Sequence, residues 1–336
     1  FTEAVLQLAN EYLENFYQGS TMQVWENGTH LKEFEGASKS HFSFSTCAIH
    51  LFFKHQREKA LEIIDKWKEQ NAFIKPEALD MIYYHLKEDA LPYFEAAIKA
   101  SAPKSGINYY SNVFSFLQQH AEPVHYLSMA WSLTKSKSKA VRELIAKIIF
   151  DKDADAETKS ISLLENKNAE TRQTAALVLS YSSTQQAKDA IMKMIDTETN
   201  DNARDILLGT VADILPTKAT MEIIADTIEA AKKRNKLNKP VEAWLDEDAL
   251  PSLFYTTGKE LSKEEKRFLL YRMSRIKTMN SDMEAKYILQ YLDKEKSSPF
   301  ALELIKIYKD KGAKPEHKYL MALAALLGND AVVDKI

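Results

Sequence analysis

The stretch of sequence that decides the fold is LLENKNAETRQTAALVLSYSSTQQAKDAIMKMIDTETNDNARDILLGTVADIL, residues 163–215. It contains two similar segments, one around Arg172 and one around Arg204, and a third lies upstream around Arg142. The three arginines are 30 and 32 residues apart. A period of this length is typical of proteins in which each repeat is one helical hairpin. The sequence therefore predicts stacked helical hairpins in the middle of the chain.

Each arginine is followed by apolar or small residues at positions +3, +4 and +7. These positions lie on one face of an α-helix, so the three helices are predicted to bury the same stripe. The nine residues are Ile145, Ala146 and Ile149, then Ala175, Ala176 and Leu179, then Leu207, Leu208 and Val211. One helix alone leaves its stripe in water, whereas stacked neighbours bury it in a continuous core.

This spacing, with the small residues that follow the arginine, resembles HEAT repeats, particularly over residues 163–215. The resemblance implies an all-α fold of the α-α superhelix type, a right-handed HEAT-like solenoid of stacked helical hairpins. In HEAT-like stacks, an arginine at this place binds acidic or carbonyl groups of the adjoining repeat. Arg142, Arg172 and Arg204 are therefore expected to form a structural ladder, with Glu170 and Asp201 as candidate partners.

The flanks are also predicted to be helical, within one continuous solenoid. Its expected parts are an irregular helix and loop cap over 1–43, helical hairpins over 44–137, HEAT-like repeats over 138–215 and C-terminal helical repeats over 216–336. Residues 18–43 are rich in Gly, Ser, Thr and Asn, which favours a loop with some local structure. Trp25 lies in this loop and is expected either to plug the end of the core or to join an interaction patch.

Helix-end signals mark several boundaries. Pro76 is expected in a first turn, where its missing N–H costs no hydrogen bond. Ser262 and Glu265 have the spacing of a capping box. Three further expectations are a helix that starts at Pro299 after an N-cap Ser298, and Gly312 and Gly328 each at the C′ position, the first residue after the C-cap of a helix.

The C-terminal third carries a second resemblance. The run WLDEDALPSL at residues 244–253, Gly258, the helix through Arg272 and Lys277, and LLGND at 326–330 are similar to the helical segment of large bacterial MolR-like proteins. Some of those proteins also carry a WGR domain, but this chain has no Trp-Gly-Arg triplet. The resemblance implies a multidomain bacterial protein and brings no enzymatic activity with it. A chain that opens at Phe1 inside a helical pattern agrees with the expectation of a piece of something larger.

Composition excludes several classes of protein. Only 8 Gly and 9 Pro occur among 336 residues, so a nucleotide-binding α/β fold, which needs Gly-rich phosphate loops, is not expected. The formal net charge of −3 gives no whole-protein attraction for nucleic acid. The single cysteine forms no internal disulfide, and the apolar runs are far shorter than the ~20 residues of a membrane span. We expect a cytoplasmic protein with no membrane contact.

No motif for catalysis or metal binding stands out. The nearest approach to a metal site is Cys47 with His50 and His55, and the apolar residues around Cys47 favour a buried small side chain instead. Acidic pairs such as Asp246 with Asp248 are expected to form solvated faces. We therefore predict no catalytic residue, no cofactor and no metal.

Basic residues form three clusters that are candidate polyanion contacts. These are Lys135, Lys137 and Lys139 beside Arg142, then Lys232, Lys233, Arg234, Lys236 and Lys239, and then Lys266, Arg267, Arg272, Arg275 and Lys277. If they share one groove, they could follow a phosphate backbone without reading bases. Intervening Glu and Asp residues favour another function, a non-catalytic scaffold that binds a protein partner. The alternative is a nucleic-acid-associated HEAT-like module, and a third class is a segment that supports an enzyme in the same polypeptide.

Overall fold

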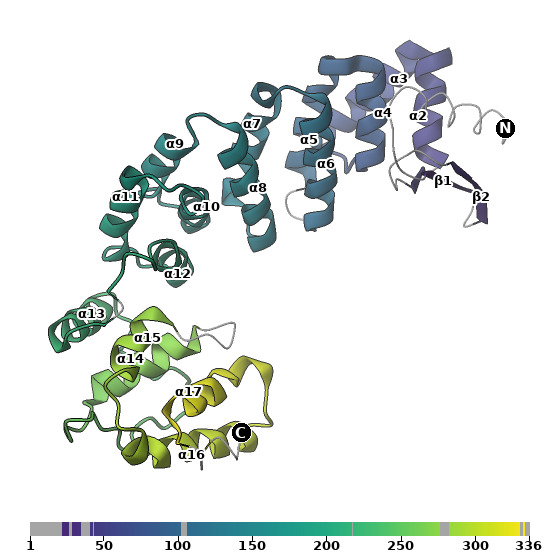
Figure 1. Ribbon diagram of the computed structural model, residues 1–336. Helices are drawn as coiled ribbons and strands as arrows, with labels where there is room; N and C mark the ends of the chain where they lie inside the picture. Colours follow the sequence, from purple (N-terminus) through teal and green to yellow (C-terminus); the bar gives the residue numbers. More distant parts are fainter. Residues whose placement is uncertain are drawn as a thin grey trace. The chain divides into compact units, whose positions relative to one another are not determined.

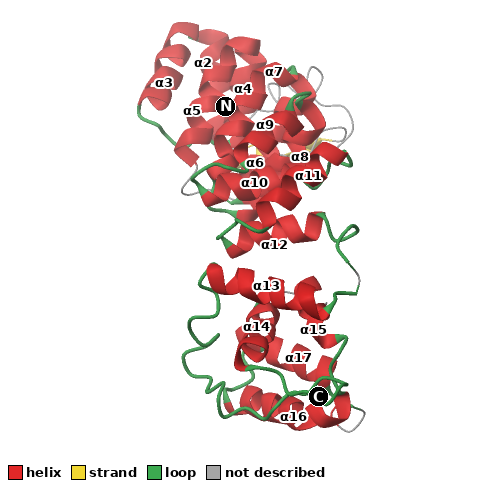
Figure 2. Cartoon of the chain, turned by 90° about the vertical axis from the view of Figure 1, so that its left-hand side faces the viewer, coloured by secondary structure: helices red, strands yellow, loops and turns green. Residues whose placement is uncertain are grey.

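A computed structural model of the chain describes residues 22–26, 29–34, 41–42, 44–101, 106–216, 218–275, 282–329 and 332, with side chains from Ile49 onward except that of Ser101. The described residues are predominantly α-helical (Figure 2), which confirms the predicted all-α class. The chain divides into two compact units, Phe1–Ile191 and Met192–Ile336. The division lies inside the segment predicted to hold the HEAT-like repeats, and α11 (Gln185–Ile195) crosses it.

A small sheet precedes the helices of the first unit. Strand β1 (Met22–Glu26) pairs antiparallel with β2 (Thr29–Phe34) and parallel with β3 (His41–Phe42), in the order β2-β1-β3. The prediction of a loop over residues 18–43 was wrong for these strands. The dipeptide Asn27-Gly28 separates β1 from β2 in the sequence and is a strong hairpin signal. The side chain of Trp25 lies outside the described residues, so its predicted role stays a prediction.

The helices of the first unit pack in two alternating rows (Figure 1). In one row, each helix packs on the next in the order α2 (Phe44–His55), α4 (Pro76–Leu86), α6 (Ile107–His120), α8 (Lys139–Lys152) and α10 (Ala169–Leu179). In the other row, α3 (Arg57–Glu69) packs on α5 (Leu91–Ser101) and α5 on α7 (Pro123–Ser132), while α9 (Ala156–Leu163) packs on α8 and α10. Short 3₁₀ turns at η1 (Lys87–Ala90) and η2 (Leu133–Lys135) join successive helices.

The core of this unit is rich in aromatic side chains. Phe94 and Phe114 are fully buried, and Tyr110 is 1% exposed. Burying an aromatic or large aliphatic side chain of this kind stabilises a fold by about 1.5–3 kcal/mol. The buried Tyr109 hydroxyl keeps a polar partner, since it donates to the Ile74 carbonyl at 2.9 Å. Pro76 begins α4, as predicted.

The second unit has its own core. Its helices are α12 (Asp201–Thr210), α13 (Met221–Lys233), α14 (Lys263–Ser274), α15 (Met283–Leu289), α16 (Lys294–Asp310), the 3₁₀ turn η3 (Pro315–His317) and α17 (Tyr319–Leu327). Residues 234–262 join α13 to α14 and lie over the core, where Leu253 is fully buried beside side chains from α14, α16 and α17.

Two of the predicted helix ends in this unit are correct and two are wrong. Ser262 and Glu265 form the capping box, and Gly312 follows α16 with a φ of +77°. Pro299 lies inside α16, which begins five residues earlier; the Ser298 hydroxyl donates to the Lys294 carbonyl at 2.8 Å beside it. Gly328 is itself the last cap residue of α17 with φ −75°, and it is needed for space, because a Cβ there would lie 2.5 Å from the Val332 side chain.

Candidate functional site

The three repeat helices begin in the same way. Residues Ser138, Asn168 and Asn200 are the N-caps of α8, α10 and α12, and each lies four residues before the repeat arginine. Each side chain accepts a hydrogen bond from the backbone N–H of the residue just before the arginine. Such caps satisfy a donor that the helix itself leaves free. All nine residues of the predicted stripe are buried.

Arg142 and Arg172 bind the loop that enters their own helix. Nη1 of Arg142 donates to the carbonyls of Ser136 and Lys137, at 2.7 and 3.1 Å. Nη1 of Arg172 donates to the carbonyls at the equivalent positions, those of Asn166 and Lys167, at 2.8 and 3.2 Å. Arg142 and Arg172 therefore make the same two hydrogen bonds at equivalent positions of their repeats.

Arg142 also bridges two repeats. Its Nη2 donates to Oε1 of Gln173 on α10 at 2.7 Å. The acidic partner proposed from sequence, Glu170, instead binds Lys137, with Nζ and Oε1 2.5 Å apart. The partners of Arg142 in the ladder are therefore the side-chain amide of Gln173 and two backbone carbonyls. No carboxylate of the described residues is bonded to Arg142.

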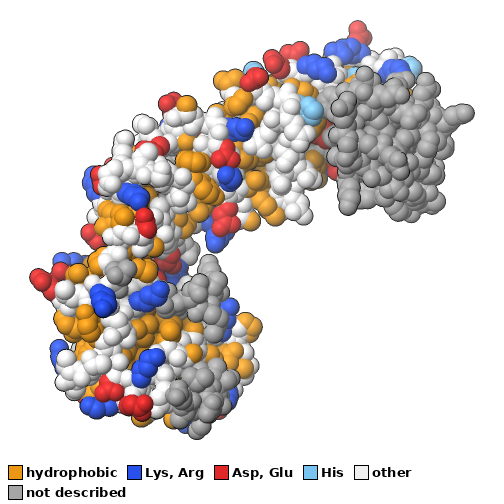
Figure 3. Space-filling view, viewed as in Figure 1, with side chains coloured by type: hydrophobic (Ala, Val, Ile, Leu, Met, Phe, Trp, Pro, Cys, Tyr) orange, Lys and Arg blue, Asp and Glu red, His pale blue; other side chains and the backbone are white. Residues whose placement is uncertain are grey.

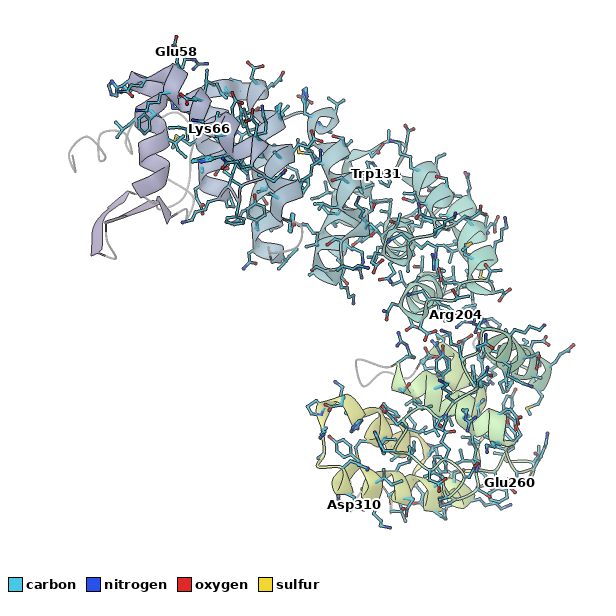
Figure 4. The ribbon with its side chains drawn as sticks, turned by 180° about the vertical axis from the view of Figure 1, so that it is seen from behind. Glu58, Lys66, Trp131, Arg204, Glu260 and Asp310 are labelled. Carbon is cyan, nitrogen blue, oxygen red and sulfur yellow. The ribbon has the colours of Figure 1, made fainter. Side chains whose placement is uncertain are left out.

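Arg204, labelled in Figure 4, has a different set of partners, and all of them belong to the second unit. Its Nη1 and Nη2 donate to Oε2 and Oε1 of Glu284 at 2.7 and 2.6 Å, and its Nε donates to the Ile195 carbonyl at 3.1 Å. Asp201, the partner expected from sequence, accepts from the Tyr271 hydroxyl at 2.8 Å and pairs with Lys236 at 3.1 Å. The arginine that continues the sequence repeat is thus part of a buried ion pair.

Arg272 joins the same network and is fully buried. Its guanidinium pairs with Asp282 at 2.7 Å, Asp205 at 3.0 Å and Glu284 at 3.2 Å. Burial alone would lower the pKa of Arg204 and of Arg272, but the neighbouring carboxylates outweigh it and raise both pKa values. Both side chains therefore remain charged, and the sequence-based assignment of Arg272 to a basic surface cluster was wrong.

Arg275 completes the network at its edge. It binds Asp205 at 3.3 Å and the amide oxygen of Asn202 at 2.7 Å. The network then holds three arginines, Arg204, Arg272 and Arg275, and the same number of carboxylates, Asp205, Asp282 and Glu284. It is balanced in charge, which is the condition under which buried ions are tolerated.

Arg234, the cap residue at the end of α13, lies close to this network without joining it. Its Nε, Nη1 and Nη2 are all buried, and none has a hydrogen-bond partner among the described residues. Burial lowers the pKa of Arg234, and the positive charge of Arg204 lowers it further. The prediction of a surface polyanion contact was wrong for this residue, because its nitrogens are shielded from solvent.

The described lysines of the basic clusters are exposed or half-buried, and half of them have acidic partners. Lys139 pairs with Glu143 at 3.2 Å and Lys232 with Glu229 at 3.2 Å, while Arg267 pairs with Glu247 at 2.5 Å. Lys135 and Lys233 are exposed. Charges of both signs are interspersed on the face seen in Figure 3. Lys277 lies outside the described residues.

A pocket of about 240 Å³ lies beside the buried network in the second unit. Its lining is mainly apolar, with the ion pair of Arg204 and Glu284 at one end and two carboxylates, Asp196 and Asp226. One of the lining side chains, Met192, is large, apolar and 41% exposed. Ile214 and Met221, which are 45% and 44% exposed, lie near the lining residues Leu215 and Ile223 in the sequence but do not line the pocket. The remaining lining residues are Ile195, Leu208, Leu215, Pro216, Ile223, Thr227, Ala230 and Tyr287.

The residues considered for metal binding are arranged differently from the prediction. His50 is buried, with its Nδ1 2.6 Å from Nε2 of His85 on α4, whereas His55 is exposed. The side chain of Cys47 lies outside the described residues. Among the described side chains, no group of three or more His, Cys, Asp and Glu could share a metal ion. None of the described helices combines the length and apolar character that crossing a membrane requires.

Comparison of the chain with protein-family models, with curated proteins and with solved structures finds no match. The resemblances to HEAT repeats and to MolR-like proteins therefore stay predictions.

Proposed function

We propose that this chain is a non-catalytic interaction segment, a HEAT-like solenoid within a larger bacterial multidomain protein, and that it binds a protein partner. The observation that supports this best is the mainly apolar pocket between α12, α13 and α15, on whose lining Met192 is 41% exposed. Large apolar side chains gathered at a concave surface are typical of interaction sites. Solenoids commonly bind partners through such surfaces.

The size of the pocket favours a side chain over a free ligand. Its volume of about 240 Å³ is below the roughly 300–1,000 Å³ of pockets that enclose drug-sized molecules. One large apolar side chain fits such a space, while the exposed side chain of Met192 extends the contact along a peptide. Methionine has a flexible side chain that adapts to different partners. The proposed occupant is therefore a short segment of another protein that inserts one large apolar side chain.

The charge at the pocket adds a second requirement on the partner. Asp196 and Asp226 both line it. Neither carboxylate forms an ion pair with another of the described side chains. A lysine or arginine next to the inserted apolar residue would complement these carboxylates. Such complementary charges select partners and speed their encounter more than they add affinity.

The nucleic-acid alternative has less support. Phosphate groups would have to compete with the carboxylates that already pair with Lys137, Lys139, Lys232 and Lys236. Binding to a duplex would weaken steeply with salt, because each phosphate contact releases counterions. We expect no measurable binding to duplex DNA at about 150 mM salt, a result that titration of a labelled duplex checks.

Peptide selection tests the proposal and does not require the partner to be identified. A displayed library of random peptides is selected on the wild-type chain, on Ala230→Trp, which fills the pocket from α13, and on Ala225→Trp, which places the same indole at an exposed position of that helix. We expect enriched peptides with a large apolar residue beside Lys or Arg on wild type and on Ala225→Trp. Recovery of the same peptides on Ala230→Trp, or no enrichment on wild type, would contradict the proposal.

A further inference from the structure

A second pocket in the second unit lies between α16 and the loop that joins α13 to α14, and we call it the Trp244 pocket after the tryptophan that lines it. Its volume is about 250 Å³, and it shares no lining residue with the pocket between α12, α13 and α15. On α16, Glu303, Ile307 and Asp310 follow one another at spacings of four and three residues, so they lie on one face of the helix. The loop opposite is anchored in the core by Leu250, which is 6% exposed.

The indole of Trp244 already attracts a cation from its own chain. Nζ of Lys311, which also lines the pocket, lies 4.9 Å from the centre of the indole ring. At this distance the negative face of the ring attracts a positive charge. The ring of His317 also contacts the indole, with 4.8 Å between the ring centres and 66° between the planes. Because Trp244 is partly exposed, a cation that arrives from solvent can reach the indole as well.

The lining of the Trp244 pocket carries more negative than positive charge. Asp246, Glu303 and Asp310, the last of which is labelled in Figure 4, line it together with Lys311. Lys306 pairs with Glu303, with Nζ and Oε1 3.4 Å apart. Neither Asp246 nor Asp310 forms an ion pair with another of the described side chains. Once Lys306 and Lys311 are counted, one negative charge is left without a counter-charge.

Two backbone N–H groups hold the carboxylate of Asp246 at the pocket. Its Oδ1 accepts from the N–H groups of Asp248 and Ala249, at 3.2 and 3.3 Å. A carboxylate has lone pairs for further hydrogen bonds, so Asp246 can accept from a ligand at the same time. The side chain is exposed, and a ligand therefore reaches it without displacing a cation.

We propose that the Trp244 pocket binds the arginine side chain of a partner protein. A guanidinium group stacks on an aromatic ring and donates paired hydrogen bonds to a carboxylate, so it suits an indole beside carboxylates better than an ammonium group does. It also brings the single positive charge that the lining lacks. Its methylene groups find apolar walls in Leu250 and Ile307. The volume is below the roughly 300–1,000 Å³ of pockets that enclose drug-sized molecules, which favours one side chain as the occupant.

This inference goes beyond the proposed function, because it concerns a separate pocket and a cationic occupant in place of an apolar one. The probe is acetylarginine methylamide, and its matched control is the citrulline compound, in which a neutral urea group replaces the guanidinium. The whole chain is labelled with fluorotryptophan, so that each of its four tryptophans gives a fluorine NMR signal, and Trp244→Phe identifies the signal of Trp244. We expect the arginine compound to shift this signal to saturation, and the citrulline compound to bind about tenfold more weakly.

Two pairs of variants locate the binding in the pocket. Asp310→Asn should weaken binding of the arginine compound about three- to fivefold, while Glu316→Gln, which removes an exposed carboxylate outside the pocket, should leave it unchanged. Lys311→Met removes the cation that competes for the indole, so it should strengthen binding about two- to fivefold. Lys314→Met removes an exposed lysine that does not line the pocket, and it should have no effect.

Several results would overturn the inference. One is a Trp244 signal that does not move, and another is an equal dissociation constant for the arginine and citrulline compounds. Equal effects of Lys311→Met and Lys314→Met would show that the cation does not bind at the indole. Tighter binding of the corresponding lysine compound would overturn the choice of arginine. The proposed function fails separately, since its peptide selection concerns the pocket between α12, α13 and α15.

Discussion

Arg204 and Glu284 form a two-pronged ion pair, with both nitrogen–oxygen distances at or below 2.7 Å and side chains only 3% and 5% exposed. The two residues are 80 positions apart in the sequence, and they join α12 to α15 within the second unit. Glu284 also reaches Nε of Arg272, at 3.2 Å. One carboxylate therefore compensates two buried guanidinium groups.

Loss of that carboxylate should be costly. Glu284→Gln keeps the shape of the side chain but leaves Arg204 and Arg272 with less negative charge, and breaking a buried pair in this way costs about 3–5 kcal/mol of unfolding free energy. The control is Glu229→Gln, which breaks the exposed pair with Lys232 and should cost at most about 1 kcal/mol. Urea unfolding followed by circular dichroism compares them, and equal midpoints for the two variants would count against the buried network.

The repeat register makes a prediction for Leu207. This residue is 1% exposed and lies on the buried stripe of α12. Leu207→Asp would therefore bury a charge without solvation, and it should abolish the cooperative melting of the second unit. Leu302→Asp, at a leucine that is 37% exposed on α16, should shift the Tm far less. A Tm for Leu207→Asp equal to that of wild type would show that the register is wrong.

The N-caps of the repeat helices should each contribute separately. Asn168 Oδ1 accepts from the Thr171 N–H at 2.9 Å, and Asn168→Ala should cost about 1 kcal/mol of unfolding free energy. Asn168→Gly should cost only a few tenths of a kcal/mol, because water reaches the freed N–H more easily. Chemical denaturation of both variants tests this, and a cost for glycine as large as that for alanine would argue against a capping role.

The contact between His50 and His85 should make the first unit sensitive to acid. Burial, and then the charge of His50, lower the pKa of His85 from 6.5 to about 4. The unfolded chain therefore binds a proton at this residue at a higher pH than the folded chain does, so stability is fully present above pH 6.5 and decreases as the pH falls toward 4.

Two histidine variants isolate that contribution. His85→Gln should flatten the fall in Tm between pH 6.5 and 4, because it removes the titrating group, while His55→Gln at an exposed position of α2 should leave the profile as it is. Melting curves across this range give the profile. A His85→Gln profile that matches wild type would assign the acid sensitivity to other residues.

The sequence predicted local features far better than those that depend on distant residues. The +3, +4 and +7 pattern after each arginine identified buried helix faces, because helical periodicity is a property of neighbouring residues. The caps Ser138, Asn168 and Asn200 repeat with the arginines and could have been found by the same comparison. The hairpin signal of Asn27-Gly28 was also present and was outweighed by the loop-like composition around it.

The candidate site depended on contacts that no local pattern contains. Glu284 lies in a short helix with no link in sequence to Arg204, and Arg272 looked like part of a basic surface until its three carboxylate partners were known. The pocket combines residues from five separate parts of positions 192–287. Pairings of this range follow from tertiary packing, which the sequence pattern of one helix does not specify.

Calorimetric titration tests most directly whether the pocket between α12, α13 and α15 is the surface that binds the partner. A peptide selected on the wild-type chain is titrated into wild type, Ala230→Trp and Ala225→Trp. If the peptide binds in the pocket, its affinity for Ala230→Trp should be at least tenfold weaker than for wild type, equivalent to about 1.4 kcal/mol. Its affinity for Ala225→Trp should equal that for wild type. Equal affinities for all three proteins would contradict the proposal, because the peptide would then bind somewhere other than the pocket.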